Sequence, residues 1–188
     1  MATNNSHEQA VQTIPQRGFF GHPSGLGVLF FVEFWERFSY YGMRAMLIFY
    51  MYDQIKNGGL GIDQTTAMSI MSVYGALIYM SSIPGAWVAD RLFGTRGATL
   101  IGAVLIIIGH VCLSLPFAMF GLFASMFFII IGSGLMKPNI SNIVGRLYPE
   151  NDTRMDAGFV IFYMSVNLGA LISPIILQHF LDVKNYHG

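Results

Sequence analysis

Charged residues are scarce in this chain of 188 residues. Asp, Glu, Lys and Arg together make up 11% of it, whereas a soluble domain usually contains about 25%. Hydrophobic residues make up 54%, with 16 phenylalanines and 12 methionines among the total. This shortage of charge indicates that lipid, rather than water, surrounds most of the chain.

Other features are missing as well. The formal net charge is zero, so the composition suggests no nucleic-acid partner. The only cysteine, Cys112, lies in an apolar run and excludes an internal disulfide. The sequence contains no HExxH, CxxC or glycine-rich phosphate loop, and no Ser-His-acid order stands out. We therefore expect no metal site, no cofactor and no enzyme.

The polar start of the chain does not resemble a cleaved signal peptide. Residues 1–24 lack both a basic beginning and an apolar centre. We expect them to form a disordered tail, with the first membrane helix acting as its own insertion signal.

Five apolar segments are long enough to cross a bilayer, which takes roughly 20 residues per helix. They cover about 25–52, 65–89, 97–115, 117–136 (with the helix continuing toward 147) and 157–180. The expected fold class is all-α transmembrane, with a helix bundle over 25–188. Because the chain stops after an odd number of helices, we expect it to be a fragment.

The basic residues between these segments predict the orientation. With the amino terminus inside, the cytoplasmic segments hold more of them than the outer segments, which hold only Lys56 and Lys184. The cytoplasmic set is Arg17, Arg91, Arg96, Arg146 and Arg154. This distribution favours a cytoplasmic amino terminus in a multi-pass cell-membrane protein.

The first apolar segment carries four ionisable residues. Three of these and a tyrosine, spaced by four, three and four residues, share one face of a helix: Glu33, Arg37, Tyr40 and Arg44. Glu36 and Tyr41 flank this stripe. Glu33 and Arg37 can pair directly because they lie one helical turn apart.

Two interpretations of the stripe remain open. It is either a structural ion pair between helices or a site for protons and substrate, and intramembrane charges favour the second. Two carboxylates beside an arginine can form a proton relay. In this interpretation the charges face a water-filled cavity, and protonation changes their pairing.

Further polar residues in the apolar segments are weaker candidates. Lys137, before Pro138, is either a snorkelling lysine or a group that lines a cavity. Glycines 132 and 134 before it indicate close helix packing. We expect Asn167 to be a buried amide, and Tyr79 is either a packing aromatic or a pocket residue.

The segment 85–96, "GAWVADRLFGTR", joins the second and third apolar segments. Gly85 and Gly94 allow a close helix approach and a tight turn. Asp90 is expected to cap the third helix or to pair with Arg91 or Arg96. The alternative is that these arginines serve only as an orientation signal.

Four stretches resemble known signatures. "GAWVADRLFGTR" resembles the loop motif between helices 2 and 3 of the major facilitator superfamily. "EFWERFSYYG" is similar to the ExxERFxYYG signature of its proton-coupled oligopeptide transporters, and "GLMKPNIS" and "FYMSVNLGALISP" resemble that family's helix 4 and helix 5 signatures. The resemblance spans residues 33–174. It implies five of the six helices of an amino-terminal bundle, with a carboxy-terminal bundle missing from the chain.

The resemblance also implies a role for each matching residue. It assigns proton coupling to Glu33, Glu36 and Arg37, and the outer gate to Arg44. It assigns peptide binding to Arg37, Tyr40, Tyr41, Tyr79, Lys137 and Asn167. The absence of a histidine from 65–89 is typical of the bacterial branch.

The implied function is proton-driven symport of di- and tripeptides by alternating access in the lipid bilayer. Two alternatives remain. One is a transporter of the same fold that carries another solute such as nitrate, and the other is a membrane module that does not transport.

Overall fold

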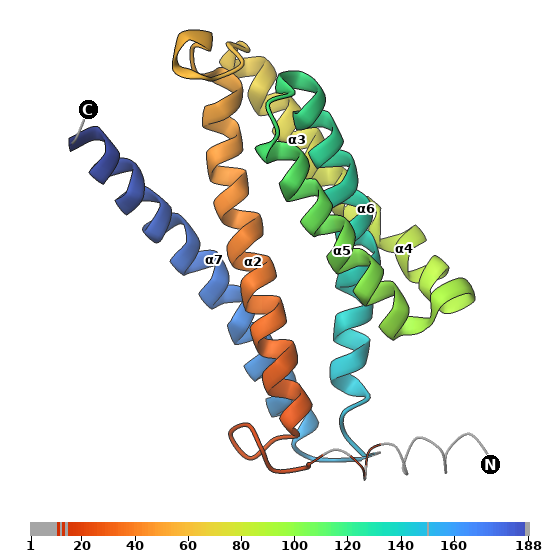
Figure 1. Ribbon diagram of the computed structural model, residues 1–188. Coiled ribbons are helices and arrows are strands. Elements are labelled where there is room, and N and C mark those ends of the chain that lie inside the picture. Colours follow the sequence, from red (N-terminus) through yellow and green to blue (C-terminus); the bar gives the residue numbers. More distant parts are fainter. Residues whose placement is uncertain (1–10, 12, 14, 150, 187–188) are drawn as a thin grey trace. The chain divides into compact units, whose positions relative to one another are not determined.

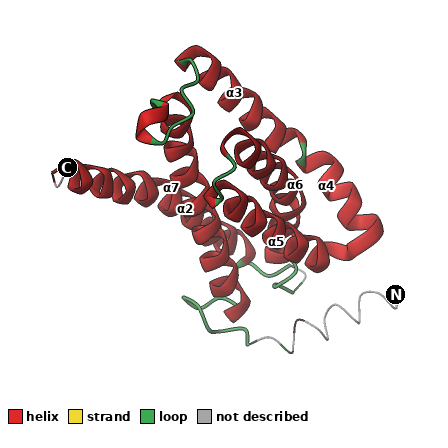
Figure 2. Cartoon of the chain, turned by 45° about the horizontal axis from the view of Figure 1, so that its top comes forward, coloured by secondary structure: helices red, strands yellow, loops and turns green. Residues whose placement is uncertain are grey.

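The computed structural model describes residues 11, 13, 15–149 and 151–186, which are helical over most of their length and contain no strand (Figures 1 and 2). They divide into two compact units. The first combines Met1–Met46 with Val144–Gly188, and the second is Leu47–Ile143.

The five predicted apolar segments are helical, and their boundaries lie close to those expected, except that α7 continues past position 180 to Tyr186. The first is α2 (Ser24–Tyr52), and the second is divided into α3 (Gln64–Met80) and α4 (Ser82–Val88). The others are α5 (Gly94–Ser114), α6 (Ala118–Gly145) and α7 (Met155–Tyr186). A short 3-10 helix, η1 (Ile55–Asn57), lies between α2 and α3.

Among the described residues, three helical runs are long and apolar enough to cross a membrane: Gln64–Ser114, Ala118–Gly145 and Met155–His179. The first of these has 51 residues and contains the turn between two predicted membrane segments. Helix α2 is also long enough, at 29 residues, but it carries the four charged side chains.

Proline and glycine shape the long run in the second unit. Pro84 has no N–H to donate to the carbonyl of Met80, and its ring crowds that carbonyl. The helix is accordingly interrupted at Ser81 between α3 and α4. A π-helical turn, η2 (Ala89–Phe93), follows, and Gly94 then takes φ 67°, which a residue with a side chain rarely adopts. The chain reverses there, which confirms the tight turn predicted at Gly94.

Glycines bring α6 into close contact with α4 and α5. A Cβ atom on Gly85 would overlap the carbonyl oxygen of Gly134, which is the carbonyl left without its helical N–H partner by Pro138. A Cβ atom on Gly102 would lie 2.6 Å from the carbonyl oxygen of Gly132. The close packing predicted at Gly85, Gly132 and Gly134 is therefore confirmed.

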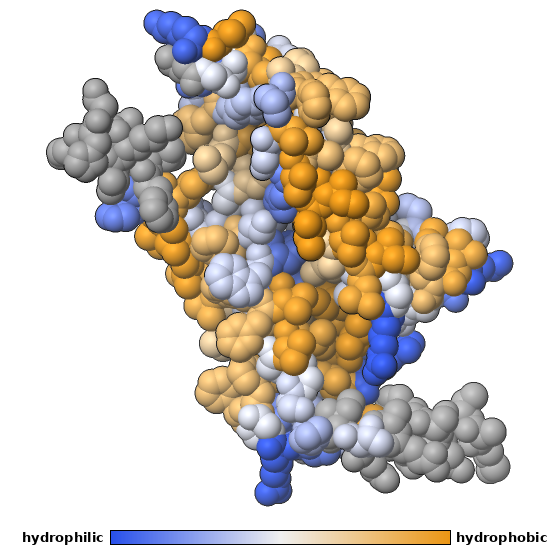
Figure 3. All heavy atoms as spheres, in the orientation of Figure 1, coloured by the Kyte–Doolittle hydropathy of each residue, from blue (hydrophilic) through white to orange (hydrophobic). Residues whose placement is uncertain are grey.

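Large hydrophobic side chains are exposed along these helices, as expected where lipid replaces water (Figure 3). Examples are Val73 at 59%, Leu100 at 68%, Ile107 at 62% and Phe120 at 75% exposed. In a soluble protein such an apolar surface would mark an interface or promote aggregation.

Candidate functional site

A buried cluster of two glutamates and one arginine lies in the middle of α2. Arg37 Nε is 3.1 Å from Glu33 Oε1, and the same nitrogen is paired with Glu36 Oε2. The three side chains are only 7–8% exposed. Helical spacing explains the contact between Glu33 and Arg37, since residues four positions apart lie on one face, whereas Glu36 and Arg37 are neighbours in the sequence. The pairing predicted between Glu33 and Arg37 is confirmed.

Two tyrosines adjoin the cluster. The guanidinium carbon of Arg37 lies 5.5 Å from the centre of the Tyr40 ring, within the range of a cation–π contact. Tyr40 is buried, and its ring packs edge to face on Tyr41, with 5.2 Å between their centres. Arg44, the last member of the predicted stripe, is exposed instead. Three members of the stripe are thus buried together, and Arg44 is not.

The burial of this cluster differs from the expectation that its charges face a water-filled cavity. With 7–8% exposure, the three side chains are largely shielded from water, and Arg37 is paired with both carboxylates. These three side chains contain two carboxylates and one guanidinium, so a proton on either carboxylate brings them to neutrality. Uncompensated charge is costly in such surroundings.

A second basic site lies in the second unit. The Nζ atom of Lys137 is 5.1 Å from the centre of the Tyr79 ring. Helix α6 continues from Lys137 to Gly145, so the lysine lies within the helix, eight residues before its end. The ring of Tyr79 is 69% exposed in this chain. The pair presents a cation beside an aromatic ring.

Asn167 is exposed, which corrects the expectation of a buried amide. Its side chain donates a 3.1 Å hydrogen bond to the carbonyl oxygen of Tyr163 in the same helix. The buried face of α7 carries small residues instead, at Ser165, Gly169 and Ser173. Asn167 lies two positions from Ser165 and from Gly169, and two positions on a helix point to opposite sides.

The charged residues of segment 85–96 do not interact as expected. Asp90, Arg91 and Arg96 are all exposed, and no ion pair joins Asp90 to either arginine within the described residues. No side chain caps α5, because the turn places Phe93, not Asp90, at the capping position. Arg91 lies 5.4 Å from the centre of the Trp87 ring. Both predicted roles of Asp90 are therefore wrong for this structure.

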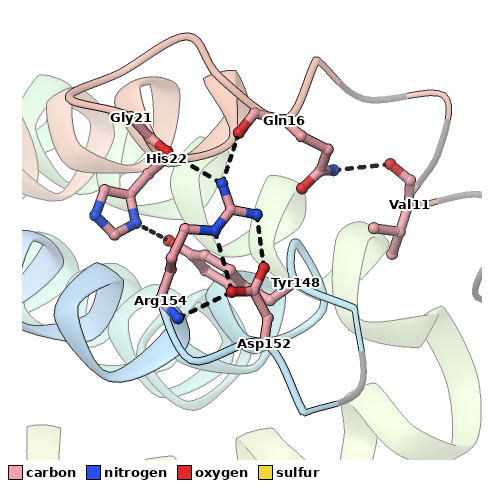
Figure 4. Close-up of polar contacts among 7 residues, drawn as sticks. All are labelled: Val11, Gln16, Gly21, His22, Tyr148, Asp152 and Arg154. Carbon is pink, nitrogen blue, oxygen red and sulfur yellow. Dashed lines mark hydrogen bonds and ion pairs between the residues drawn. The ribbon is translucent and has the colours of Figure 1, made fainter.

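A second polar cluster, which the sequence reasoning missed, joins the segment before α2 to the loop before α7 (Figure 4). Arg154 Nη1 donates to the carbonyl oxygens of Gln16 at 3.0 Å and Gly21 at 3.1 Å. Its Nε and Nη2 atoms donate to the two carboxylate oxygens of Asp152, at 3.0 and 2.6 Å. Nδ1 of His22 lies 3.0 Å from the Tyr148 hydroxyl. We call this set the amino-terminal clasp.

The clasp corrects the prediction that residues 1–24 form a disordered tail, as far as 15–23 are concerned. It also perturbs the acidity of its own groups. Side-chain hydrogen bonds from Arg154, and then its backbone N–H, hold the pKa of Asp152 below its usual value. Burial raises the pKa of the Tyr148 hydroxyl. In the sequence Arg154 had indicated only membrane orientation.

Neither of the two described cavities includes a predicted site residue. One, of about 410 Å³, is lined mainly by apolar residues of α3 and α6, among them Val73, Leu77 and Phe127. The other, of about 670 Å³, lies along α3 from Gln64 to Val73. The described residues contain no group of three or more His, Cys, Asp or Glu side chains suited to a metal.

These features define the class: a multi-pass membrane protein with a buried, ionisable cluster in one of its helices. The sequence pattern of the POT family (PTR2) matches residues 97–188. A di-/tripeptide transporter of Lactococcus lactis subsp. cremoris is 51% identical over 174 residues, which are 92% of this chain and 35% of that protein.

Solved structures agree with this result. A POT family transporter crystallised with 5-aminolevulinic acid is 88% identical, with a TM-score of 0.89 over 95% of this chain and 37% of that one. Another, in complex with a thioalcohol-conjugated peptide, is 87% identical, with a TM-score of 0.90 over 96% of this chain and 37% of that one. The chain belongs to the POT family, and it spans somewhat more than a third of the length of these relatives.

Proposed function

We propose that the full-length protein drives the uptake of di- and tripeptides with the proton gradient, by alternating access across the cell membrane. The observation that carries this proposal is the buried set of Glu33, Glu36 and Arg37 on α2. A membrane helix rarely keeps such groups without a use for them. The coupling ion is the proton, and we expect no further cofactor.

The proton step follows from the shared guanidinium. Arg37 is paired with Glu33 and with Glu36 through the same nitrogen, so the two carboxylates compete for one cation. Protonation of one carboxylate leaves the arginine to the other and alters the charge that the helix presents. Two such pairings are the elements of a proton-dependent switch.

The substrate is proposed from the chemistry of both basic sites. Arg37 and Lys137 are suited to a terminal carboxylate, Tyr40, Tyr41 and Tyr79 offer aromatic faces with polar tips, and Asn167 can both donate to and accept from a peptide bond. The relatives support this assignment. One is a di-/tripeptide transporter, and another was crystallised with 5-aminolevulinic acid, a small molecule with an amino group and a carboxylate.

The proton step is tested in proteoliposomes that contain the full-length protein, with labelled dialanine and an imposed pH gradient. Glu33→Gln and Glu36→Gln should each abolish accumulation and retain some peptide exchange without a gradient. Asp156→Asn is the matched control, because Asp156 is an exposed carboxylate at the start of α7. Accumulation at the wild-type rate in both glutamine variants would overturn the relay.

The substrate class is tested by competition against labelled dialanine. Free dipeptides with varied side chains should compete well, since the proposed polar contacts go to termini and backbone. Amidation of their carboxyl terminus should weaken competition sharply, and nitrate should not compete. Equal competition by free and amidated peptides would remove the roles of Arg37 and Lys137, and competition by nitrate alone would favour the other solute.

A cytoplasmic amino terminus is the remaining part of the proposal, with Arg44 at an outer gate formed with a carboxy-terminal bundle. The clasp joins Arg154 to Gln16 and Gly21, so the two segments lie on the same side of the membrane, and the distribution of basic residues favours the cytoplasmic side. Single-cysteine variants in a Cys112→Ala background test it. An impermeant maleimide should label Lys56→Cys in intact cells, and Arg146→Cys only after lysis; the reverse pattern would invert the orientation.

A further inference from the structure

The small residues on the buried face of α7 contact α2 at the turn that carries Arg37. A Cβ atom on Gly169 would lie 2.7 Å from the carbonyl oxygen of Phe34 and 2.8 Å from the Cβ atom of Arg37. The Cβ atom of Arg37 therefore packs directly against Gly169. No residue with a side chain fits there unless one of the two helices moves.

One turn further along α7, Ser173 makes a hydrogen bond to α2. Its hydroxyl donates to the carbonyl oxygen of Phe38 at 2.6 Å, and the side chain is almost fully buried. A Cβ atom on Gly42 would lie 2.7 Å from that hydroxyl oxygen. Because a carbonyl oxygen has two lone pairs, Phe38 can accept this bond in addition to a helical one.

We propose that Gly169 and Ser173 are positioning residues for the charged cluster of α2. Together they hold the segment from Phe34 to Gly42 against α7. They thereby fix the position of the Arg37 backbone and of its Cβ atom. The distances from its guanidinium to Glu33 and Glu36 follow from that position. This inference rests on the proposed function, because it assigns the proton step to these three side chains.

The contact between α7 and α2 lies where a small displacement of the α2 backbone would change the ion pairing of Arg37. Arg37 Nε meets both carboxylates, so a shift of the α2 backbone changes its balance between them. The titratable groups beside this cluster on α2 itself are Tyr40 and Tyr41, whereas α7 meets it with Gly169 and Ser173, which do not titrate. The influence of these two residues is therefore one of position.

Ser165 provides a matched control. It lies on the same face of α7 and is as buried as Ser173, and its hydroxyl also makes a 2.6 Å hydrogen bond. Its acceptor, however, is the carbonyl oxygen of Phe162 in its own helix. Ser165→Ala and Ser173→Ala thus remove the same group from the same helix, and only the second removes a bond to α2.

The test compares the two variants of the full-length protein in proteoliposomes. Ser173→Ala should lower the ratio of proton-driven accumulation to peptide exchange by roughly threefold or more, the size expected when an interhelical hydrogen bond is lost. Ser165→Ala should leave that ratio unchanged. If both variants lower accumulation and exchange by one common factor, Ser173 is only structural and the inference is overturned.

A second measurement keeps this result separate from the transport proposal. Infrared difference spectra of the purified protein follow carboxyl protonation against pH without any substrate, and Glu33→Gln and Glu36→Gln identify the bands. Ser173→Ala should move the titration of these bands, and Ser165→Ala should not. Absence of proton-driven uptake by the wild type would refute the proposed function alone, whereas identical titrations in both serine variants would refute the positioning role alone.

Discussion

The first unit contains two arginine–carboxylate clusters, and their differences are informative. Arg37 pairs with Glu33 and Glu36 inside one helix, at 7–8% exposure. Arg154 pairs with Asp152 outside the helices, where its own side chain is 35% exposed, and it also binds carbonyl groups of a remote segment. An arginine–carboxylate pair thus carries a large desolvation penalty in α2, whereas in the clasp it tethers two segments with a smaller penalty.

The physical reason is solvation. A buried ion pair gives up the hydration of both partners, so that its worth depends on every partner being present. In the clasp the side chain of Arg154 is 35% exposed and that of Asp152 is 9% exposed, so this pair keeps part of its hydration. Variants of the buried cluster should therefore lower stability, because they leave a buried charge unpaired. Variants of the clasp should instead loosen the segment before α2.

The largest effect is expected from removing one side of the buried cluster. Arg37→Ala leaves two carboxylates without their cation and should destabilise the protein by about 3–5 kcal/mol. Thermal unfolding in detergent, with the yield of monodisperse protein, measures the loss. The triple variant that adds Glu33→Gln and Glu36→Gln should recover most of it. A triple variant no more stable than Arg37→Ala would show that the arginine stabilises by packing rather than by charge.

A smaller effect is expected at Lys137, a cation that lies in the second unit beside an aromatic ring. Lys137→Ala should weaken the binding of dipeptides roughly ten- to hundredfold, the loss of a charge-assisted hydrogen bond. Stability should change less than in Arg37→Ala, because Lys137 is only partly buried and lies beside the exposed ring of Tyr79. Equilibrium binding of labelled dialanine measures the change, and unaltered affinity would remove Lys137 from the proposed site.

The clasp should respond in local order rather than in transport. Arg154→Ala should increase the mobility of a spin label at Phe20→Cys in a Cys112→Ala background, since Phe20 is 82% exposed and lies between the two tethered carbonyls. Arg154→Lys should give an intermediate result, because an ammonium lacks the planar fork of donors. Arg91→Ala, which removes an exposed arginine of the second unit, should have no effect. Equal mobility in all three would mean that the clasp does not hold the segment.

The smallest effect is the acid response of the clasp. The pKa of Asp152 is lower in the folded protein than in the unfolded chain. Its contribution is therefore fully present above the unfolded value of about 4 and is lost as the pH falls through the lower folded value. The mobility of the label at position 20 should rise only at strongly acidic pH, and Asp152→Asn should lack this step. The same step in Asp152→Asn would assign it to another group.

Sequence alone was sufficient where the geometry is local. The helices could be predicted from apolar length, and the pairing of Glu33 with Arg37 from the helical repeat, because neither requires knowledge of packing partners. Gly94 could be placed in a turn for the same reason. The resemblance to peptide transporters could be predicted from the four family signatures.

Contacts between elements could not be predicted in the same way. The exposure of Asn167 depends on which face of α7 packs, although the spacing of Ser165, Gly169 and Ser173 carried that signal. The sequence pattern indicates only the positive charge of Arg154, since its partners Gln16 and Gly21 lie more than 130 residues away. Asp90 was expected to cap α5, and the π-helical turn places it elsewhere.

The clasp also constrains the order of events during synthesis. Arg154 and Gln16 are separated by 138 positions, so the segment before α2 has no tether while α2 to α6 are being translated. At about 5–20 residues per second, the ribosome takes roughly seven seconds or more to supply the missing arginine. Throughout that time residues 15–23 are held only by local contacts. The beginning of the chain is thus secured late in biogenesis, after four helical segments have been delivered to the membrane.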